Sequence, residues 1–434
     1  MQPGAVHKSD VTVIGGGLAG MAASLHLAKA GFRVVCIELE TQVRQPVGES
    51  LDWASPGLLG ALGLPMEDLV NRAIATYKRG VTLQLSDATS KKYRPGPWLG
   101  RPPFNVELRT IHVDRMRLDR EIQELVARQG VTVVHDKALT VERAGTRIAS
   151  VHTASGGRFA SPWFIDASGS TGLLAREFSL PAVAYGPRKV ALWTYFNAPL
   201  AQEGTTIYMD GARGAYQDWV WEIPIGPNTL SVGYVTTGEA IKKGRDRGLT
   251  VEDILRLQLA RFPRLASILQ TPQNAADGLP RVTSFSCRTY RGIAGPNWII
   301  VGEAASMVDP ITSNGVTAAL RHAEEASALL AEFRGRSELP RGARASYDRR
   351  VLRMGKFFNG GIERFVYDWP VRDRLGLTRA ATVYTFAAWT MNGLYSRLRP
   401  RGVLSTAAFG ALLDVLRASA WICYRLCSYF SRAI

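Results

Sequence analysis

The stretch Asp10-Val-Thr-Val-Ile-Gly-Gly-Gly-Leu-Ala-Gly20 decides the fold, together with the later segment Gly31-Phe-Arg-Val-Val-Cys-Ile-Glu38. A short β-branched run gives way to a glycine-rich turn and then to apolar residues at helical spacing. After Gly31 a second apolar run begins. This order predicts a strand, a tight turn, a helix and a parallel strand, which is the βαβ unit of dinucleotide-binding folds.

Each glycine of the turn has a separate expected role. Gly15 permits the turn, Gly17 lets the backbone approach a pyrophosphate, and Gly20 lets the helix pack close to the strand. The helix N-terminus offers unpaired amides to phosphate groups. Glu38 ends the second strand at about the twenty-residue offset expected of a carboxylate that binds a ribose. We therefore predict a dinucleotide site, the alternative being an ordinary α/β turn.

Length and composition set the broad class. At 434 residues the chain exceeds the usual size of a single core, so we expect two or three structural units. The first ten residues contain no apolar segment of a secretory signal, and we expect a cytoplasmic protein. The four cysteines, Cys36, Cys287, Cys423 and Cys427, lack the partners of a metal site and are predicted to be reduced structural thiols.

The positive charge is concentrated near the end of the chain. The net charge is +16, and residues 341–434 hold 16 Arg or Lys against 5 Asp or Glu. No zinc pattern, RNA-binding aromatic signature or basic zipper accompanies this charge, so nucleic acid is not the expected partner. An acidic protein, peptide or carrier protein is expected instead, steered by arginines such as Arg341, Arg344, Arg349, Arg350 and Arg353.

The pattern of apolar residues divides the rest of the chain. Alternation at 81–85 suggests strands of a second sheet, and a helix should run from the N-cap Asp114 to about Gly130. A further helix is expected at about 251–269, and a long one from the turn Ser313-Asn-Gly315 to about Phe333. The expected segments are 8–80 (βαβ unit with the following loop and helix), 81–110 (inserted strands of the substrate sheet), 111–186 (nucleotide domain continued), 187–290 (substrate-domain sheet), 291–335 (closing strand and helix) and 341–434 (basic helical region).

The last of these segments is apolar in places, such as 380–395. None of its stretches is uniformly apolar over the length of a membrane-spanning helix. Buried helices are the expected structure, with peripheral contact to a membrane as the alternative.

Three separated motifs resemble the FAD sites of glutathione-reductase-type flavoprotein monooxygenases. They are the glycine turn with Glu38, the segment Asp166-Ala-Ser-Gly169, and Gly302-Glu-Ala-Ala-Ser-Met-Val-Asp-Pro310. Within that group, Val47-Gly-Glu-Ser-Leu51 and Trp219-Val-Trp-Glu-Ile-Pro224 resemble the flavin-dependent halogenases, most closely those acting on pyrrolyl or other aromatic groups held by a carrier protein. The resemblance implies an α/β fold with a Rossmann-like FAD domain, an inserted β-rich substrate domain and a helical C-terminal region.

The resemblance also implies a chemistry. Reduced FAD reacts with O2 to give a C4a-hydroperoxide, whose distal oxygen goes to chloride or to the substrate, while the protein supplies orientation and a dry site. We see no second dinucleotide motif, so electrons are expected from transiently docking NAD(P)H or from a separate flavin reductase. Lys78 matches the lysine that receives the oxidised halogen in the halogenases, and it is the predicted catalytic residue. The alternative is a solvated lysine beside Arg79.

The remaining candidate residues fall into two sets. The residues expected to bind the cofactor are Gly15, Gly17, Gly20, Glu38, Arg44, Glu49, Arg115, Asp166, Gly302, Glu303, Asn314 and Gly315. The residues expected in the substrate pocket are Trp219, Trp221, Glu222 and Met307. For Arg44 a solvated surface position is the alternative.

The chain departs from the halogenase pattern at four positions. Met307 stands where a phenylalanine is typical, Asn314 where a small residue is typical, and Thr312 where the tryptophan-type enzymes carry a glutamate. Glu303 stands where most relatives have aspartate. These changes affect the implied halide site more than the flavin site.

Three functions are therefore expected in descending order. The first is an FAD-dependent monooxygenase that hydroxylates an indole or tryptophan-like ring on a protein, as in tryptophylquinone biogenesis for quinohemoprotein amine dehydrogenase. The second is a halogenase of a carrier-tethered pyrrole or other aromatic group. The third is a membrane-associated isoprenoid reductase or cyclase, against which the double-tryptophan motif argues.

Overall fold

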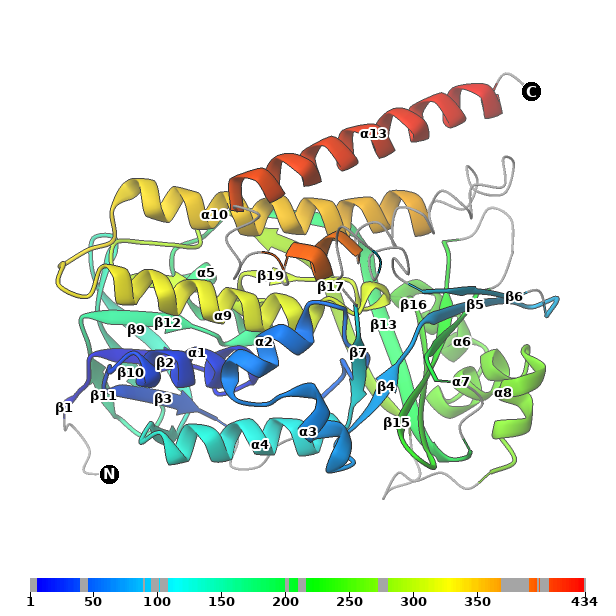
Figure 1. Ribbon diagram of the computed structural model, residues 1–434, viewed down its shortest axis with the longest axis horizontal. Coiled ribbons are helices and arrows are strands. Elements are labelled where there is room, and N and C mark those ends of the chain that lie inside the picture. Colours follow the sequence, from blue (N-terminus) through cyan, green and yellow to red (C-terminus); the bar gives the residue numbers. More distant parts are fainter. Residues whose placement is uncertain are drawn as a thin grey trace.

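A five-stranded parallel sheet carries the nucleotide-binding half of the molecule (Figure 1). Its order is β18 (Trp298–Ile300), β12 (Trp163–Asp166), β2 (Val11–Ile14), β3 (Val34–Glu38) and β8 (Thr132–His135). Strands β18, β12 and β2 are buried throughout and β3 up to its last residue, as expected of parallel strands covered on both faces, whereas the edge strand β8 is partly exposed. The computed structural model describes residues 6–39, 46–88, 90–94, 101, 108–199, 203–209, 216–271, 280–367, 390–395, 398 and 406–432.

Helices pack against this sheet. They are α1 (Leu18–Lys29), α4 (Arg115–Arg128) and α9 (Gly315–Glu332), and α1 lies against both of the others. Asp114 caps α4 as predicted, because its side chain accepts a hydrogen bond of 3.2 Å from the backbone amide of Arg117. A separate four-stranded sheet has the order β1 (Val6–Lys8), β11 (Arg158–Ala160), β10 (Arg147–Thr153) and β9 (Ala138–Ala144).

The second large sheet is assembled from three separate parts of the chain. Its order is β19 (Ser306–Met307), β17 (Arg281–Tyr290), β13 (Ala182–Asn197), β16 (Thr229–Thr237), β15 (Trp219–Gly226), β14 (Thr205–Met209), β5 (Val81–Leu85) and β6 (Ser90–Tyr93). The sheet is mixed. Strands β14 and β5 pair in parallel, and all other neighbouring strands of this sheet pair antiparallel. One face packs on the helices α6 (Gly238–Asp246), α7 (Val251–Leu259) and α8 (Pro263–Ile268). The other face carries the tryptophans of the Trp-x-Trp motif.

The prediction of a single helix at about 251–269 is wrong. The chain forms α7 and α8 instead, separated by a turn that ends at Phe262. Pro263 begins α8, and Phe262 before it is extended, because a residue that precedes proline is driven out of the helical conformation. Thr250 starts α7 with a capping box to Asp253.

A small two-stranded sheet lies between the two halves. It pairs β4 (Ala75–Lys78) with β7 (Thr110–Val113) in antiparallel register, with Thr76 opposite His112. The helices α2 (Ser55–Leu62) and α3 (Met66–Asn71) precede it, and α5 (Leu173–Glu177) follows β12. Both β4 and β7 contact β15, so this sheet joins the nucleotide half to the double-tryptophan strand.

The C-terminal part is helical where it is described. It contains α10 (Arg341–Gly355), two π-helical segments (Lys356–Gly360 and Glu363–Tyr367) and α13 (Thr406–Arg432). Helix α13 rests on α10 through Phe409 and Leu413 and then extends away from the body (Figure 1). Most of the apolar stretch 380–395 lies outside the described residues. Among the described helices, none combines the length and the apolar character needed to span a bilayer.

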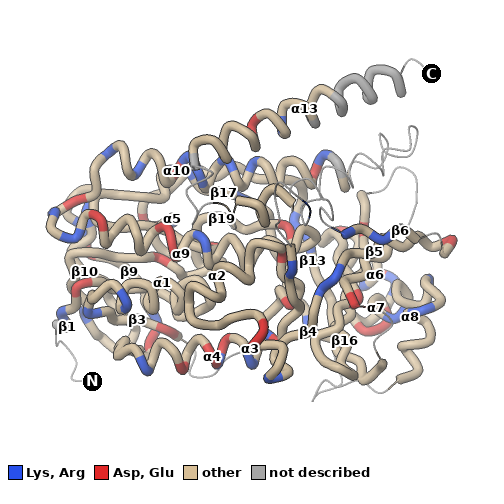
Figure 2. Tube along the Cα trace, in the orientation of Figure 1, with Lys and Arg blue, Asp and Glu red and all other residues tan. Residues whose placement is uncertain are grey.

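The basic residues of α10 are partly engaged within the molecule. Arg350 forms an ion pair of 3.1 Å with Glu325, and Arg353 one of 3.0 Å with Asp414. Figure 2 shows that basic positions also lie on α4, β6 and α8, so those of α10 are one group among several. Arg350 and Arg353 thus pair with carboxylates of this chain, and the steering of an acidic partner by this helix stays a prediction.

Candidate functional site

A cavity of about 570 Å³ lies between the glycine turn and the second large sheet. Gly16, Gly17 and Glu38 line it from the nucleotide half, and Trp219 and Trp221 line it from the sheet. Its volume is in the range of cavities that hold cofactors and small substrates. Both halves of the fold therefore contribute to one site.

The conformation of the glycine turn explains why its residues are small. Gly15 has a φ of +93°, and a Cβ there would lie 2.5 Å from the carbonyl oxygen of Ala167. A Cβ on Gly20 would lie 1.8 Å from the carbonyl oxygen of Gly15, so α1 can approach the turn only with glycine at this position. A Cβ on Gly17 would meet nothing within 4 Å. Gly17 thus faces open space, as a backbone that is approached by a pyrophosphate must.

Glu38 and Arg115 organise the backbone around the cavity that they line. The Glu38 carboxylate accepts a hydrogen bond from the amide of Gly16. Arg115 donates to the carbonyl oxygen of Val47 at 2.9 Å and pairs with Asp119 at 3.0 Å. Arg115 therefore holds the segment that carries the Val-Gly-Glu-Ser-Leu motif.

Glu49 is a buried carboxyl on the cavity wall. It is 1% exposed and accepts a hydrogen bond of 2.5 Å from the hydroxyl of Tyr195. Burial raises its pKa to about 7, against the opposing effect of hydrogen bonds from Ser231 and Tyr195. Glu49 thus lies inside the site as an acid whose proton can exchange near neutral pH.

Two residues expected at the cofactor do not line the cavity with their side chains. Asp166 accepts hydrogen bonds from the amides of Ser168 and Leu174 at 2.9 and 2.7 Å. Its carboxylate therefore holds the turn after β12, and the residues of that turn that line the cavity are Ala167, Gly169 and Ser170. Gly302 packs on α1 instead, since a Cβ there would lie 2.7 Å from that of Ala19. Asp166 and Gly302 therefore shape the turns beside the cavity, and their contacts with the cofactor stay predictions.

Asn314 is also turned away from the cavity. Its side-chain amide donates to Asp52 at 2.5 Å, and the amide of Asn392 donates to the same carboxylate oxygen at 2.6 Å. The neighbouring Gly315 and Glu303 do line the cavity. The side chain of Asn314 is thus engaged with Asp52, and a contact between Asn314 and the cofactor stays a prediction. Arg44 lies outside the described residues.

The double-tryptophan motif forms one wall. The indoles of Trp219 and Trp221 lie 5.8 Å apart between centroids, and the Trp221 nitrogen donates to Ser231 at 3.1 Å. Glu222 was expected in the pocket, but it lies on the opposite face of the sheet because successive strand residues alternate between faces. There it accepts hydrogen bonds from Tyr208 at 2.5 Å and from Arg264 of α8 at 3.2 Å.

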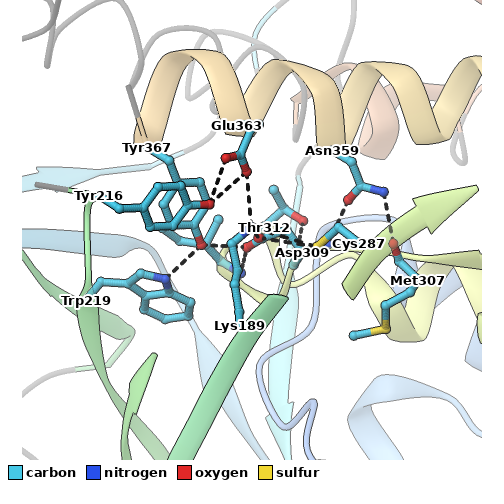
Figure 3. Close-up of polar contacts among 11 residues, drawn as sticks. Lys189, Tyr216, Trp219, Cys287, Met307, Asp309, Thr312, Asn359, Glu363 and Tyr367 are labelled. Atoms are coloured by element: carbon cyan, nitrogen blue, oxygen red, sulfur yellow. Dashed lines mark hydrogen bonds and ion pairs between the residues drawn. The ribbon is translucent and has the colours of Figure 1, made fainter. Parts of the chain in front are cut away.

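The turn from Met307 to Ser313 forms a second wall, and a buried polar cluster holds it from behind (Figure 3). Asn359 donates to the carbonyl oxygen of Met307 and accepts from the amide of Asp309, both at 2.9 Å. The hydroxyl of Thr312 donates to the carbonyl oxygen of Asp309 at 2.9 Å. Thr312 therefore stabilises its own turn and brings no carboxylate to this wall.

Lys189 is the cation of that cluster. It pairs with Asp309 at 2.9 Å and with Glu363 at 3.1 Å, and both Lys189 and Asp309 are 1% exposed. Burial alone would lower the pKa of Lys189, but the surrounding carboxylates, Asp309 above all, raise it well above its ordinary value. The hydroxyl of Tyr367 donates to Asp309 at 3.1 Å and accepts from the Trp219 nitrogen at 3.0 Å (Figure 3). The cluster thus connects the C-terminal segment to both walls.

Lys78 is buried beside the cavity. It is 2% exposed, donates to the carbonyl oxygen of Leu51 at 2.9 Å and to the hydroxyl of Ser313 at 3.5 Å, and lies 4.8 Å from the centre of the Trp53 ring. Burial lowers its pKa to about 7, opposed by the charge of Asp52. The alternative of a solvated surface lysine is therefore excluded.

Several residues of the site were not singled out in the sequence, among them Asp52, Lys189 and Ser313. Asp52 is a buried carboxylate, and Lys189 is a buried cation. Ser313 lines the cavity and has a φ of +55°. A charged residue between apolar neighbours, Leu51 and Trp53, was a usable signal for Asp52, whereas Lys189 follows Arg188 at the start of an apolar run and gave none. Ser313 gave no such signal, because backbone strain of this kind depends on the surrounding structure.

The described residues contain no group of three or more His, Cys, Asp or Glu placed to hold a metal ion. Cys36 and Cys287 are buried free thiols.

Comparison with protein families gives two matches. The model described as "Tryptophan halogenase" matches residues 109–359, and the model described as "FAD binding domain" matches residues 10–90. Together they cover the strands and turns that line the cavity.

Individual proteins are similar over most of the chain. "Flavin-dependent halogenase ptaM" of Pestalotiopsis fici is 27% identical over 78% of this chain, and "Tryptophan 2-halogenase" of Chondromyces crocatus is 27% identical over 75%. This chain spans only 66% and 60% of the length of those two relatives. The "1H-pyrrole-2-carbonyl-[peptidyl-carrier protein] chlorinase" of Pseudomonas fluorescens is 27% identical over 75% of this chain and 76% of its own length.

The fold is also that of solved structures. The structure of "flavin-dependent brominase Bmp2" superposes with a TM-score of 0.73 at 20% identity, covering 96% of this chain and all of that chain. The likeness supports the α/β flavoprotein fold predicted from the sequence.

Proposed function

The chain belongs to the tryptophan halogenase family, and on that premise we propose that it is a flavin-dependent halogenase that places a halogen on an electron-rich aromatic ring. The observation that carries the proposal is the position of Lys78. Its amine is buried, has a pKa near 7, and reaches Ser313 on the wall shared by the FAD-binding and tryptophan-lined parts of the cavity. An amine in that place can hold and deliver an electrophile while water is excluded.

The cofactor is FAD, and the residues around the cavity fit it. Gly16, Gly17 and Glu38 suit the nucleotide end, since Gly17 leaves room for a phosphate and Glu38 offers a carboxylate to a ribose. Bound and reduced, the flavin supplies the activation of dioxygen that oxidises the halide. We expect its electrons from NAD(P)H or from a separate flavin reductase.

The names of the relatives support halogenation over ring hydroxylation. Ring hydroxylation was the first expectation from the sequence motifs alone. Three curated relatives carry halogenase or chlorinase names, and one of them is named for a carrier-bound pyrrole. An aromatic group presented on a carrier or other acidic protein is therefore our proposed substrate class. Ring hydroxylation is the second candidate, because Thr312 supplies no carboxylate where tryptophan-type halogenases have one.

Product analysis with and without halide tests the reaction. The protein is supplied with FAD, a flavin reductase, NADH and either chloride or bromide, and it is offered free tryptophan and pyrrole-2-carboxylate loaded on a carrier protein. We expect a product in which a halogen replaces a ring hydrogen, visible by its isotope pattern in mass spectrometry. A product that gains oxygen and no halogen in either salt would instead establish hydroxylation.

The open space at Gly17 gives a matched pair of variants. Gly17→Ala should retain FAD, because its Cβ would meet nothing within 4 Å. Gly17→Asp should weaken FAD binding by about fivefold or more, because a carboxylate then faces the pyrophosphate and unit charges 4 Å apart repel by about 1 kcal/mol even in water. The flavin absorbance of each purified protein and its dissociation constant measure this. Equal retention by both variants would mean that the phosphates bind elsewhere.

A further inference from the structure

A chain of hydroxyl groups leads from Lys78 to a buried histidine. Lys78 donates to Ser313 at 3.5 Å, and Ser313 donates to Ser50 at 3.1 Å. Ser50 and Thr205 are 2.8 Å apart, and Thr205 is 3.0 Å from Nε2 of His112. Ser50, Thr205 and Ser313 all line the cavity, while His112 is fully buried behind them.

The two ends of the chain fix its direction. Nδ1 of His112 is 3.4 Å from the hydroxyl of Thr76, and that hydroxyl donates to the carbonyl oxygen of Pro224 at 2.6 Å. A carbonyl oxygen can only accept, so Thr76 is the donor there and accepts from Nδ1–H of His112. Nε2 of His112 then carries a lone pair and accepts from Thr205. Since the Lys78 ammonium can only donate, the donors along the chain all point from Lys78 toward His112.

We propose that His112 is the proton acceptor for Lys78, and that Ser313, Ser50 and Thr205 carry the proton between them. The inference rests on the proposed function, in which the Lys78 amine must present a lone pair to an electrophile. Lys78 loses one N–H proton to Ser313. Each hydroxyl passes its own proton on and receives another, and Nε2 of His112 gains an N–H bond. No electrons are transferred, and the row of hydrogen-bonded side chains from Lys78 to His112 carries one positive charge before and after the transfer.

The charges around the chain are consistent with this transfer. The pKa of His112 is held well below its ordinary value by burial and by the charge of Lys78. Transfer removes that second effect, because Lys78 becomes neutral as His112 becomes charged. Asp52, which faces Lys78, keeps its own hydrogen bonds to Asn314 and Asn392 throughout. The step thus moves one buried charge between two sites and does not create a new one.

The proposal also gives a role to residues of the motifs. Ser50 belongs to the Val-Gly-Glu-Ser-Leu segment, and Pro224 ends the Trp-x-Trp-x-Ile-Pro segment. The row of hydrogen-bonded side chains therefore connects one motif to the other through residues of β4 and β7. It offers a proton path on a wall where Thr312 supplies no carboxylate.

The pH dependence of product formation separates a proton relay from a structural role. With a pKa near 7, Lys78 is mostly neutral at pH 8 and mostly protonated at pH 6, so the relay matters most at the lower pH. The rate of product formation by His112→Gln and by Thr205→Val is compared with that of the unaltered protein at each pH. We expect the loss in each variant to be about tenfold larger at pH 6 than at pH 8. This is a modest part of the 10²–10⁴-fold typical of such proton transfer. Thr205→Ser should restore the profile. Thr206→Val, which removes the adjacent hydroxyl on the strand, should leave its shape unchanged.

A second measurement needs no turnover. Nitrogen-15 NMR of the imidazoles at pH 7, assigned by comparison with His112→Gln, should show His112 neutral, protonated at Nδ1 and unprotonated at Nε2. A proton on Nε2, or equal losses at both pH values in His112→Gln and Thr205→Val, would overturn the relay. The NMR result does not depend on which product forms. Failure of the relay is therefore distinguishable from failure of the halogenase assignment, which shows as the absence of halogenated product.

Discussion

Lys78→Met is expected to retain FAD and to lose about 100- to 1,000-fold in product formation, or about 2.7–4 kcal/mol, the range typical for a positioned group that acts in the transition state. Methionine matches the length and apolar character of the lysine stem. The variant therefore removes the amine beside Ser313 without opening a cavity next to Trp53. Flavin absorbance, the rate of flavin reoxidation and product yield are measured on the same preparation.

Reoxidation should continue in Lys78→Met while product is lost, because the amine acts after oxygen has been activated. The carboxylate of Asp52, which faces Lys78, keeps its hydrogen bonds from Asn314 and Asn392 in this variant, so the midpoint of thermal unfolding should change little. Lys137→Met, at an exposed position, is the matched control and should behave like the unaltered chain. Product formation that survives in Lys78→Met would remove Lys78 from the chemistry altogether.

Lys189→Met is expected to lower the free energy of unfolding by about 3–5 kcal/mol, as is typical when one partner of a buried ion pair is removed. The variant removes the cation that contacts Asp309, 1% exposed, at 2.9 Å and Glu363 at 3.1 Å. Urea unfolding followed by fluorescence measures the change.

A surface pair provides the control for this effect. Arg33 and Asp10 form an ion pair of the same 2.9 Å length, but the Arg33 side chain is 76% exposed. Arg33→Met should therefore cost at most about 1 kcal/mol. Adding Asp309→Asn to Lys189→Met should recover part of the loss, because the uncompensated charge is then gone. A loss below about 1 kcal/mol in Lys189→Met would show that the cluster does not stabilise the turn.

Much of the fold and the outline of the site follow from local sequence. The glycine turn, the capping of α4 by Asp114 and the run of buried parallel strands each depend on neighbouring residues alone, and so they could be predicted. The family motifs directed attention to Lys78. The position of Glu222 could have been predicted as well, since alternation along β15 places it opposite to Trp219 and Trp221.

The partners of the buried polar groups were decided only by the tertiary structure. Asp52 and Asn392 are 340 residues apart, and Lys189 and Glu363 are 174 residues apart, yet each pair is in hydrogen-bond contact. The same holds for the link between Ser50 and Ser313, 263 residues apart. Sequence periodicity states which face of a strand or helix is buried, but not which distant element covers it. The burial that lowers the pKa of Lys78 and the contacts that join it to His112 arise only when those distant elements pack together.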